Sequence, residues 1–141
     1  MTDCISYKKG YKYQLAKTYN IKIEIKPLEH ILTHFIDLAT DGTLIIRKGY
    51  AWDGCSGPTW DDKTNMRGGL IHDALYQIIR QEYLGQAYRA IADKILKGIC
   101  LEDGMCKVRA WYYYHAVKKF AKFAADPGNK KKVIKAPKGC K

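Results

Sequence analysis

The sequence lacks the cysteine patterns that staple small folds or bind structural zinc. Its five cysteines are an odd number, and no two of them form a Cys-x-x-Cys pair. The odd count argues against a closed set of disulfides, and the missing pair argues against a zinc site. We therefore expect a protein of a reducing compartment that folds around a hydrophobic core. A chain of 141 residues with 47% hydrophobic content is sufficient for one such core.

Long apolar segments are also missing. No run reaches the roughly 18 apolar residues that a membrane-spanning helix needs. The amino-terminal charges are not followed by the apolar segment of a secretory signal. The sequence therefore predicts no membrane span, and it predicts a protein that stays in the cytoplasm of the cell that makes it.

Acidic residues are scarce, with 14 Asp and Glu against 25 Lys and Arg, so the net charge is +11. This excess favours anionic partners, either nucleic acid or an anionic small molecule such as a nucleotide. Six of the lysines lie in residues 126–141, and a short basic end of this kind is most often solvated. We divide the chain into a single domain over residues 1–125 and a basic C-terminal tail over residues 126–141.

The first third of the chain has the pattern of a small antiparallel sheet. Isoleucine alternates with charged residues over 21–26, which is typical of a half-buried strand. A further strand is expected near 12–16. Residues 33–50 predict a hairpin, because two apolar runs flank Asp41 and Gly42, a strong turn dipeptide.

The second half has helical periodicity. Helices are expected over 68–80, 86–99 and 105–125, and the first two form an antiparallel hairpin because only 81–85 separates them. The core stripe of the last helix consists of Ala110, Tyr113, Val117, Phe120 and Ala124. The predicted fold class is thus α+β, a small N-terminal antiparallel sheet followed by three helices.

A long loop over 50–69 connects the two halves. It is rich in glycine and has no periodicity, and a loop of this length in a compact domain is usually functional or disordered. Trp52 and Trp60 argue for order, because each has a large apolar area to bury.

The helical hairpin predicts a contact between His72 and Asp93. The two positions average to about 82.5, the middle of the turn, so both side chains lie at nearly the same level. With about 100° of rotation per residue, both also lie on flanks reached by the same sense of rotation. The second helix can lie on either side of the first, and the two flanks face each other in only one of these arrangements.

Two readings of this pair remain open. A carboxylate that bonds one imidazole nitrogen fixes the tautomer and raises the basicity of the other, as in a general base that activates water. His72 would be that base and Asp93 its orienting partner. The alternative is that a buried His–Asp pair simply ties two helices together. The catalytic reading requires the pair to open onto a pocket.

Other polar residues could complete a site around the pair. Ser56 is a weak candidate nucleophile, because "GCSGP" does not have the nucleophile-elbow pattern. Cys55 is another candidate, although one cysteine near one histidine is a common coincidence. Asp53 and Asp73 are the candidate metal ligands, with a divalent cation as the candidate cofactor. The candidate substrate- or cation-binding residues are Asp53, Gly54, Ser56, Asp73, Tyr76 and Arg89.

The layout is similar to that of secreted phospholipases A2. Those enzymes carry a His-Asp dipeptide on one helix, a partner Asp on an antiparallel helix and a glycine-rich calcium loop upstream. The corresponding residues here are His72, Asp73 and Asp93. This chain does not have their cysteine framework, so the likeness is one of layout and could have arisen by convergence.

The motifs "WDGCSGP", "LIHDALY", "RAIAD" and "YHAVKKF" resemble the phage and prophage family catalogued as domain of unknown function 1353. The resemblance covers roughly residues 45–120. It departs at Gly57, where the family usually has an apolar residue. The resemblance implies a phage or prophage source and no particular activity. The matching residues are Asp53, Gly54, Ser56, Pro58, His72, Asp73, Leu75, Tyr76, Arg89, Ala92, Asp93, Ala116 and Val117.

Three functions follow as hypotheses. The first is a hydrolase-like enzyme that uses the His72–Asp93 pair on an anionic substrate. The second is a non-catalytic phage accessory protein that binds nucleotide or nucleic acid, because eleven tyrosines and many lysines suit stacking and phosphate contact. The third is a phage structural or host-interaction component, in which the polar residues only hold the fold.

Overall fold

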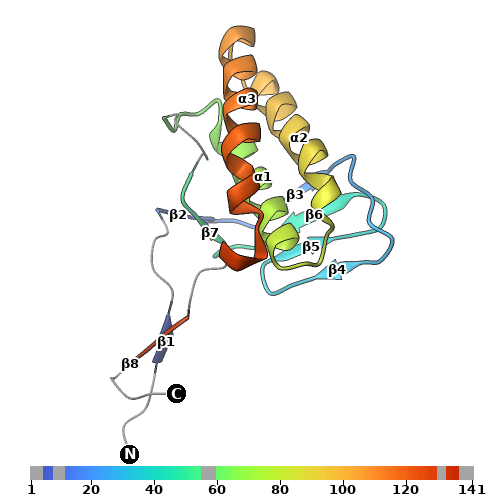
Figure 1. Ribbon diagram of the computed structural model, residues 1–141, viewed down its shortest axis with the longest axis vertical. Helices are drawn as coiled ribbons and strands as arrows, with labels where there is room; N and C mark the ends of the chain where they lie inside the picture. The colour runs from blue at the N-terminus through green and yellow to red at the C-terminus, as the bar shows by residue number, and fades with distance from the viewer. Residues whose placement is uncertain (1–4, 8–11, 55–59, 130–132, 137–141) are drawn as a thin grey trace, which may run out of the picture.

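A computed structural model has the α+β architecture that the sequence predicts, with the helices gathered on one side of a four-stranded sheet (Figure 1). It describes residues 5–7, 12–54, 60–129 and 133–136. The helices are α1 (Met66–Arg80), α2 (Arg89–Glu102) and α3 (Lys107–Ala124), with short 3-10 helices η1 (Gln86–Tyr88) and η2 (Pro127–Asn129). The strands are β1 (Ile5–Tyr7), β2 (Tyr13–Gln14), β3 (Tyr19–Lys22), β4 (Ile31–Leu32), β5 (Ile36–Leu38), β6 (Thr43–Ile46), β7 (Ala51–Trp52) and β8 (Ile134–Ala136).

The main sheet is antiparallel and has the order β3-β6-β5-β4. The hairpin predicted around Asp41 and Gly42 is confirmed, because these residues connect β5 to β6. The carboxylate of Asp41 accepts a hydrogen bond from the backbone N–H of Thr43 at 2.9 Å. Gly42 has φ +93°, a conformation that side chains disfavour. This turn places the apolar sides of both strands against the helices.

One hydrophobic core joins the sheet to the helices. Ile71, Leu75 and Ile78 of α1 are fully buried, at the spacing that places them on one side of a helix. Leu38 pairs with Leu44 and Ile36 pairs with Ile46 across β5 and β6, and all four side chains are buried. The predicted hairpin of the first two helices is also confirmed, since α1 packs against α2, which in turn packs against α3.

Two further strand pairs lie outside the main sheet. β2 pairs with β7, close to the predicted strand near 12–16. β1 pairs with β8, so part of the predicted basic tail forms a strand with the start of the chain. Figure 1 shows this two-stranded ribbon extending away from the rest of the molecule.

The stripe predicted for the third helix is confirmed at Ala110, Tyr113 and Val117, which are buried in α3. The side chains of Phe120 and Ala124 lie outside the described residues. Within the described ranges, no helix combines the length and the apolar character that crossing a membrane requires.

Candidate functional site

The turn between α1 and α2 brings the two predicted site residues together. α1 ends where Glu82 takes a left-handed φ of +67°. The backbone N–H groups of Tyr83 and Leu84 then return to the carbonyl of Ile78 at 2.9 and 3.2 Å, a helix-ending arrangement that reverses the chain. The chain then enters η1 and α2, which runs back along α1.

The predicted contact between His72 and Asp93 is confirmed. Nε2 of His72 lies 2.7 Å from Oδ1 of Asp93. The Tyr76 hydroxyl, one helical turn beyond His72, donates to the same oxygen at 2.7 Å. The rings of His72 and Tyr76 stack at a centroid distance of 4.1 Å. We call these three residues the buried polar cluster.

The cluster lies in the core rather than in a cleft. His72 is 2% exposed and Asp93 is 4% exposed. Burial, and then the neighbouring Asp93 carboxylate, raise the pKa of Tyr76 far above its ordinary value. Tyr76 therefore keeps its proton and remains a donor to Asp93. Because Asp93 takes Nε2, only Nδ1 of His72 could accept a proton from water, and the buried ring offers a substrate no open face.

A catalytic role requires His72 and Asp93 to open onto a pocket, and the small exposed fractions of both side chains do not fit that requirement. A buried carboxylate that accepts from two donors on another helix is a strong tie between the helices. The geometry favours the structural alternative, in which Asp93 of α2 fastens His72 and Tyr76 of α1.

The upstream loop is held by a contact that the sequence did not suggest. Gly54 is buried with φ +89°, and a Cβ there would lie 2.6 Å from a carboxylate oxygen of Asp61. Asp61 also accepts hydrogen bonds from Lys12 at 3.0 Å and from the hydroxyl of Tyr13 at 2.8 Å. The sequence pattern could not predict these contacts of Asp61, because 48 residues separate Tyr13 from Asp61.

The remaining predicted site residues do not gather around His72. Asp53 is exposed and Asp73 is half-buried. Arg89 is half-buried and lines a separate pocket. Ser56 lies outside the described residues. Over the described part of the chain, no group of three or more His, Cys, Asp or Glu side chains could hold a metal ion.

A second candidate site lies on the outer side of α3. Val108, Trp111 and Tyr112 are 79%, 58% and 55% exposed, which is unusual for three large apolar residues on one helix. With about 100° per residue, they share a side with His115 and Lys119, opposite the buried stripe. We call these five residues the α3 outer face.

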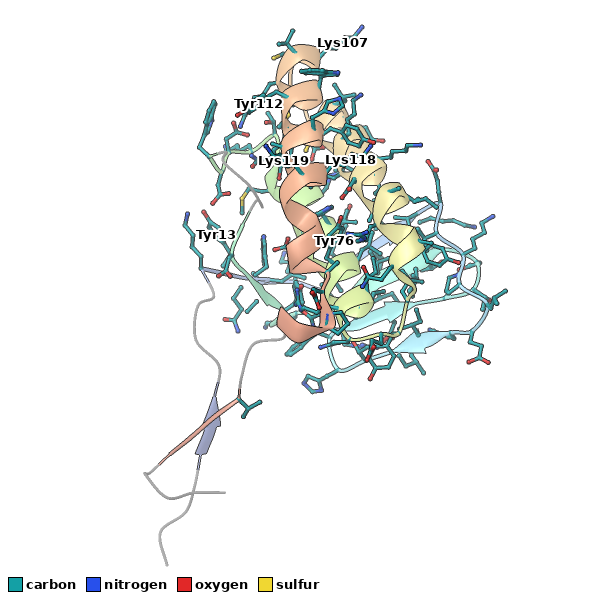
Figure 2. All side chains as sticks on the ribbon, viewed as in Figure 1. Tyr13, Tyr76, Lys107, Tyr112, Lys118 and Lys119 are labelled. Atoms are coloured by element: carbon teal, nitrogen blue, oxygen red, sulfur yellow. The ribbon has the colours of Figure 1, made fainter. Side chains whose placement is uncertain are left out.

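The helix that carries this face is basic along its whole length. Its sequence, KVRAWYYYHAVKKFAKFA, contains no Asp or Glu. Figure 2 shows Lys107, Tyr112, Lys118 and Lys119 spread along α3. Of the three consecutive tyrosines of α3, Tyr113 is buried whereas Tyr112 is exposed. The basic residues of α3 are Lys107, Arg109, Lys118, Lys119 and Lys122.

Aromatic rings on both sides of α3 also contact cations. The Trp60 side chain is 67% exposed. The guanidinium of Arg109 lies 4.4 Å from the centre of its ring. The ammonium of Lys97 in α2 lies 5.3 Å from the ring of Tyr114. Aromatic and positive groups therefore meet on both flanks of α3.

The turn before α1 holds Trp60 beside α3. Asp62 accepts from the backbone N–H of Thr64 at 2.8 Å and forms an ion pair with Arg109. The amide of Asn65 donates to the carbonyl of Trp60 at 2.8 Å. The hydrogen bond from the Thr64 hydroxyl, followed by that from Arg109, lowers the pKa of Asp62 to about 2.

This low pKa predicts a specific loss of stability in acid. The folded-state pKa of Asp62 lies below the ordinary value of 3.8. The contribution of its ionised carboxylate to the free energy of unfolding is therefore complete above pH 3.8. It is lost as the pH falls from about 4 to about 2. We expect the unfolding free energy of Asp62→Asn, measured by urea denaturation across this range, to fall less steeply than that of the wild type. Glu29→Gln, which removes an exposed carboxylate, should retain the wild-type slope.

Comparison with known proteins found no match to a family model, to a curated protein or to a solved structure. The resemblance to the phage family therefore stays a prediction.

Proposed function

We propose that this protein is a non-catalytic accessory protein that binds single-stranded nucleic acid on the α3 outer face. The observation that carries the proposal is the exposure of Trp111 and Tyr112 on a helix with basic residues and no acidic ones. Proteins that bind single strands combine a positive surface, which follows the phosphates, with aromatic rings on which bases stack. Both elements are present on one side of α3.

The rings favour a single strand over a duplex. Stacking requires an unpaired base, whereas phosphate contacts alone would need no exposed tryptophan. Trp60 extends the same surface beyond the helix, and Arg109 beneath it adds a positive charge at the ring. A strand that crosses α3 could thus meet several rings in succession.

The burial of His72 and Asp93 argues against the hydrolase hypothesis. A general base must reach the proton that it abstracts, directly or through one water. His72 and Asp93 are 2% and 4% exposed, and the bonds that Asp93 accepts from His72 and Tyr76 explain their burial as a structural tie between helices.

The test is binding of a fluorescently labelled oligonucleotide of about 12 nucleotides, a length that one domain can cover. Anisotropy is measured between about 50 and about 200 mM salt, where binding through phosphates should weaken steeply. We expect Trp111→Ala to weaken binding by about 5- to 150-fold, since stacking contributes about 1–3 kcal/mol per base. We expect Lys118→Gln with Lys119→Gln, at and beside the α3 outer face, to lower the salt slope by about 1.4, at about 0.7 per phosphate contact.

The matched control is Lys22→Gln with Lys26→Gln, which removes the same charge from exposed positions in and beside β3. This pair should weaken binding less than the pair on α3. Equal losses for the two pairs, with no effect of Trp111→Ala, would show that binding is non-specific attraction to a positive protein. Absence of any binding at low salt would reject the proposal.

A further inference from the structure

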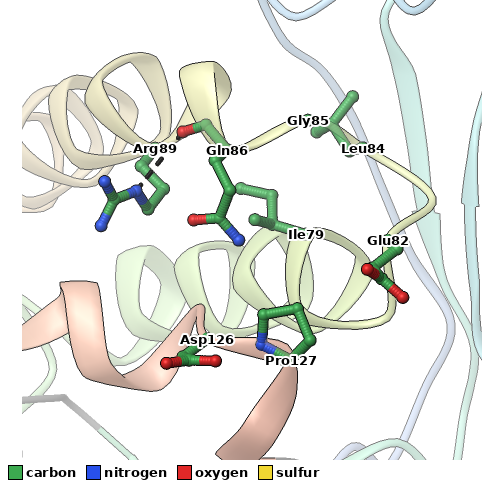
Figure 3. Close-up of a pocket in the computed structure, with 8 residues that line it drawn as sticks. All are labelled: Ile79, Glu82, Leu84, Gly85, Gln86, Arg89, Asp126 and Pro127. Atoms are coloured by element: carbon green, nitrogen blue, oxygen red, sulfur yellow. Dashed lines mark hydrogen bonds between the residues drawn. The ribbon is translucent and has the colours of Figure 1, made fainter.

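A separate pocket lies at the C-terminal end of α1, between the start of α2 and η2 (Figure 3). Its volume is about 460 Å³, within the range of small-molecule sites. Ile79, Leu84 and Pro127 supply its apolar surface. The pocket contains none of the residues of the α3 outer face, so nothing inferred from it depends on the proposed function.

One end of the pocket carries a positive group that is already oriented. Nε of Arg89 donates to the carbonyl of Gln86 at 3.3 Å, which directs the guanidinium. Among the described residues, nothing bonds to the two outer nitrogens of Arg89. The Gln86 amide is itself held by its bond to the carbonyl of Ala125 at 2.9 Å. A guanidinium with both outer nitrogens available is suited to a carboxylate.

The other charged groups of the pocket are negative. Figure 3 shows Glu82 at the end opposite Arg89, with Ile79 and Gln86 between them. The left-handed backbone of Glu82 sets the direction of its side chain. Asp126 lies on the facing wall, where one of its oxygens accepts from the backbone N–H of Gly128 at 2.9 Å. The second oxygen of Asp126 and the carboxylate of Glu82 can both accept from an ammonium group.

This arrangement selects a ligand with two charges. A simple anion would be repelled by the two carboxylates of Glu82 and Asp126, and a simple cation would leave the guanidinium of Arg89 without a partner. We infer that the pocket binds a short apolar peptide with free termini, with its carboxylate at Arg89 and its ammonium at Glu82. The apolar side chains of the peptide would lie on Ile79, Leu84 and Pro127.

The probe is the dipeptide leucyl-leucine, compared with its N-acetyl and C-amide forms by isothermal titration calorimetry. We expect saturable binding of the free dipeptide and a loss of about tenfold for each blocked form, because each removes one charge-assisted contact. Arg89→Gln should abolish the difference between the acid and the amide. Glu82→Gln together with Asp126→Asn should abolish the difference between the free and the acetylated amine.

The control is Lys94→Gln, an exposed residue of α2 outside this pocket, which should leave all affinities unchanged. Near-ultraviolet circular dichroism checks that each variant is folded. Equal affinity for free and blocked dipeptides, or no saturable binding by the folded wild type, would overturn the inference. Oligonucleotide binding is measured on the same preparations. Loss of dipeptide binding at the pocket and loss of oligonucleotide binding at the α3 outer face can therefore be told apart.

Discussion

Replacing Asp93 with alanine is expected to lower the free energy of unfolding by about 3–5 kcal/mol. The substitution removes the one oxygen that accepts from both His72 and Tyr76. Two polar groups would then remain in the core without an acceptor, and each such group is costly when water cannot reach it. The measurement is urea denaturation followed by tryptophan fluorescence and circular dichroism.

Two variants show whether this loss comes from the buried polar cluster. Tyr76→Phe removes one of the two donors and should cost about 0.5–1.5 kcal/mol. Lys94→Ala changes the exposed residue next to Asp93 and should stay within about 0.5 kcal/mol of the wild type. A cost below about 1 kcal/mol for Asp93→Ala would mean that the cluster does not hold α1 to α2. In that case its polarity would again need a functional explanation.

Gly42→Ala is expected to cost about 2–4 kcal/mol, which makes it the second largest effect. The residue has φ +93° in the turn between β5 and β6. A Cβ atom there would lie 2.3 Å from the carbonyl oxygen of Ile23, well inside contact distance. That oxygen belongs to the backbone, so a change of rotamer cannot relieve the clash. The turn must therefore shift, and the sheet register depends on it.

The same substitution at Gly98 provides a control of opposite sign. Gly98 lies on the exposed side of α2, and no atom lies within 4 Å of the position that a Cβ would take. Alanine there should raise the free energy of unfolding by about 0.5–1 kcal/mol, because it favours the helix. Thermal unfolding of both variants would show the contrast directly. Similar behaviour at the two sites would contradict the conformation of the β5–β6 turn.

Local patterns in the sequence were sufficient for much of this fold. The turn dipeptide Asp41–Gly42 predicted the β5–β6 hairpin, since its conformation depends on neighbouring residues alone. Helical periodicity likewise predicted three helices, and each lies within a few residues of its expected bounds. The contact between His72 and Asp93 could also be predicted, because a short turn between helices fixes which positions share a level.

Other features of the site depend on contacts between distant segments. Periodicity placed His72 on a flank of its helix, but the burial of that flank follows from how α2 packs against it. The bonds from Lys12 and Tyr13 to Asp61 join segments 49 and 48 residues apart. The ion pair between Arg109 and Asp62 spans 47 residues. Such pairs have no spacing rule, because loop closure over these distances allows many partners.

By itself, then, the sequence determined the class of fold, the turn and helix positions, the positive charge and the common level on which the His72–Asp93 contact depends. These follow from backbone sterics, periodicity and composition, which act locally or on the whole chain. Only the tertiary structure decided that this contact is enclosed and that Trp111 and Tyr112 are exposed. Exposure depends on which surfaces meet when the layers pack, and that is a property of the assembled molecule.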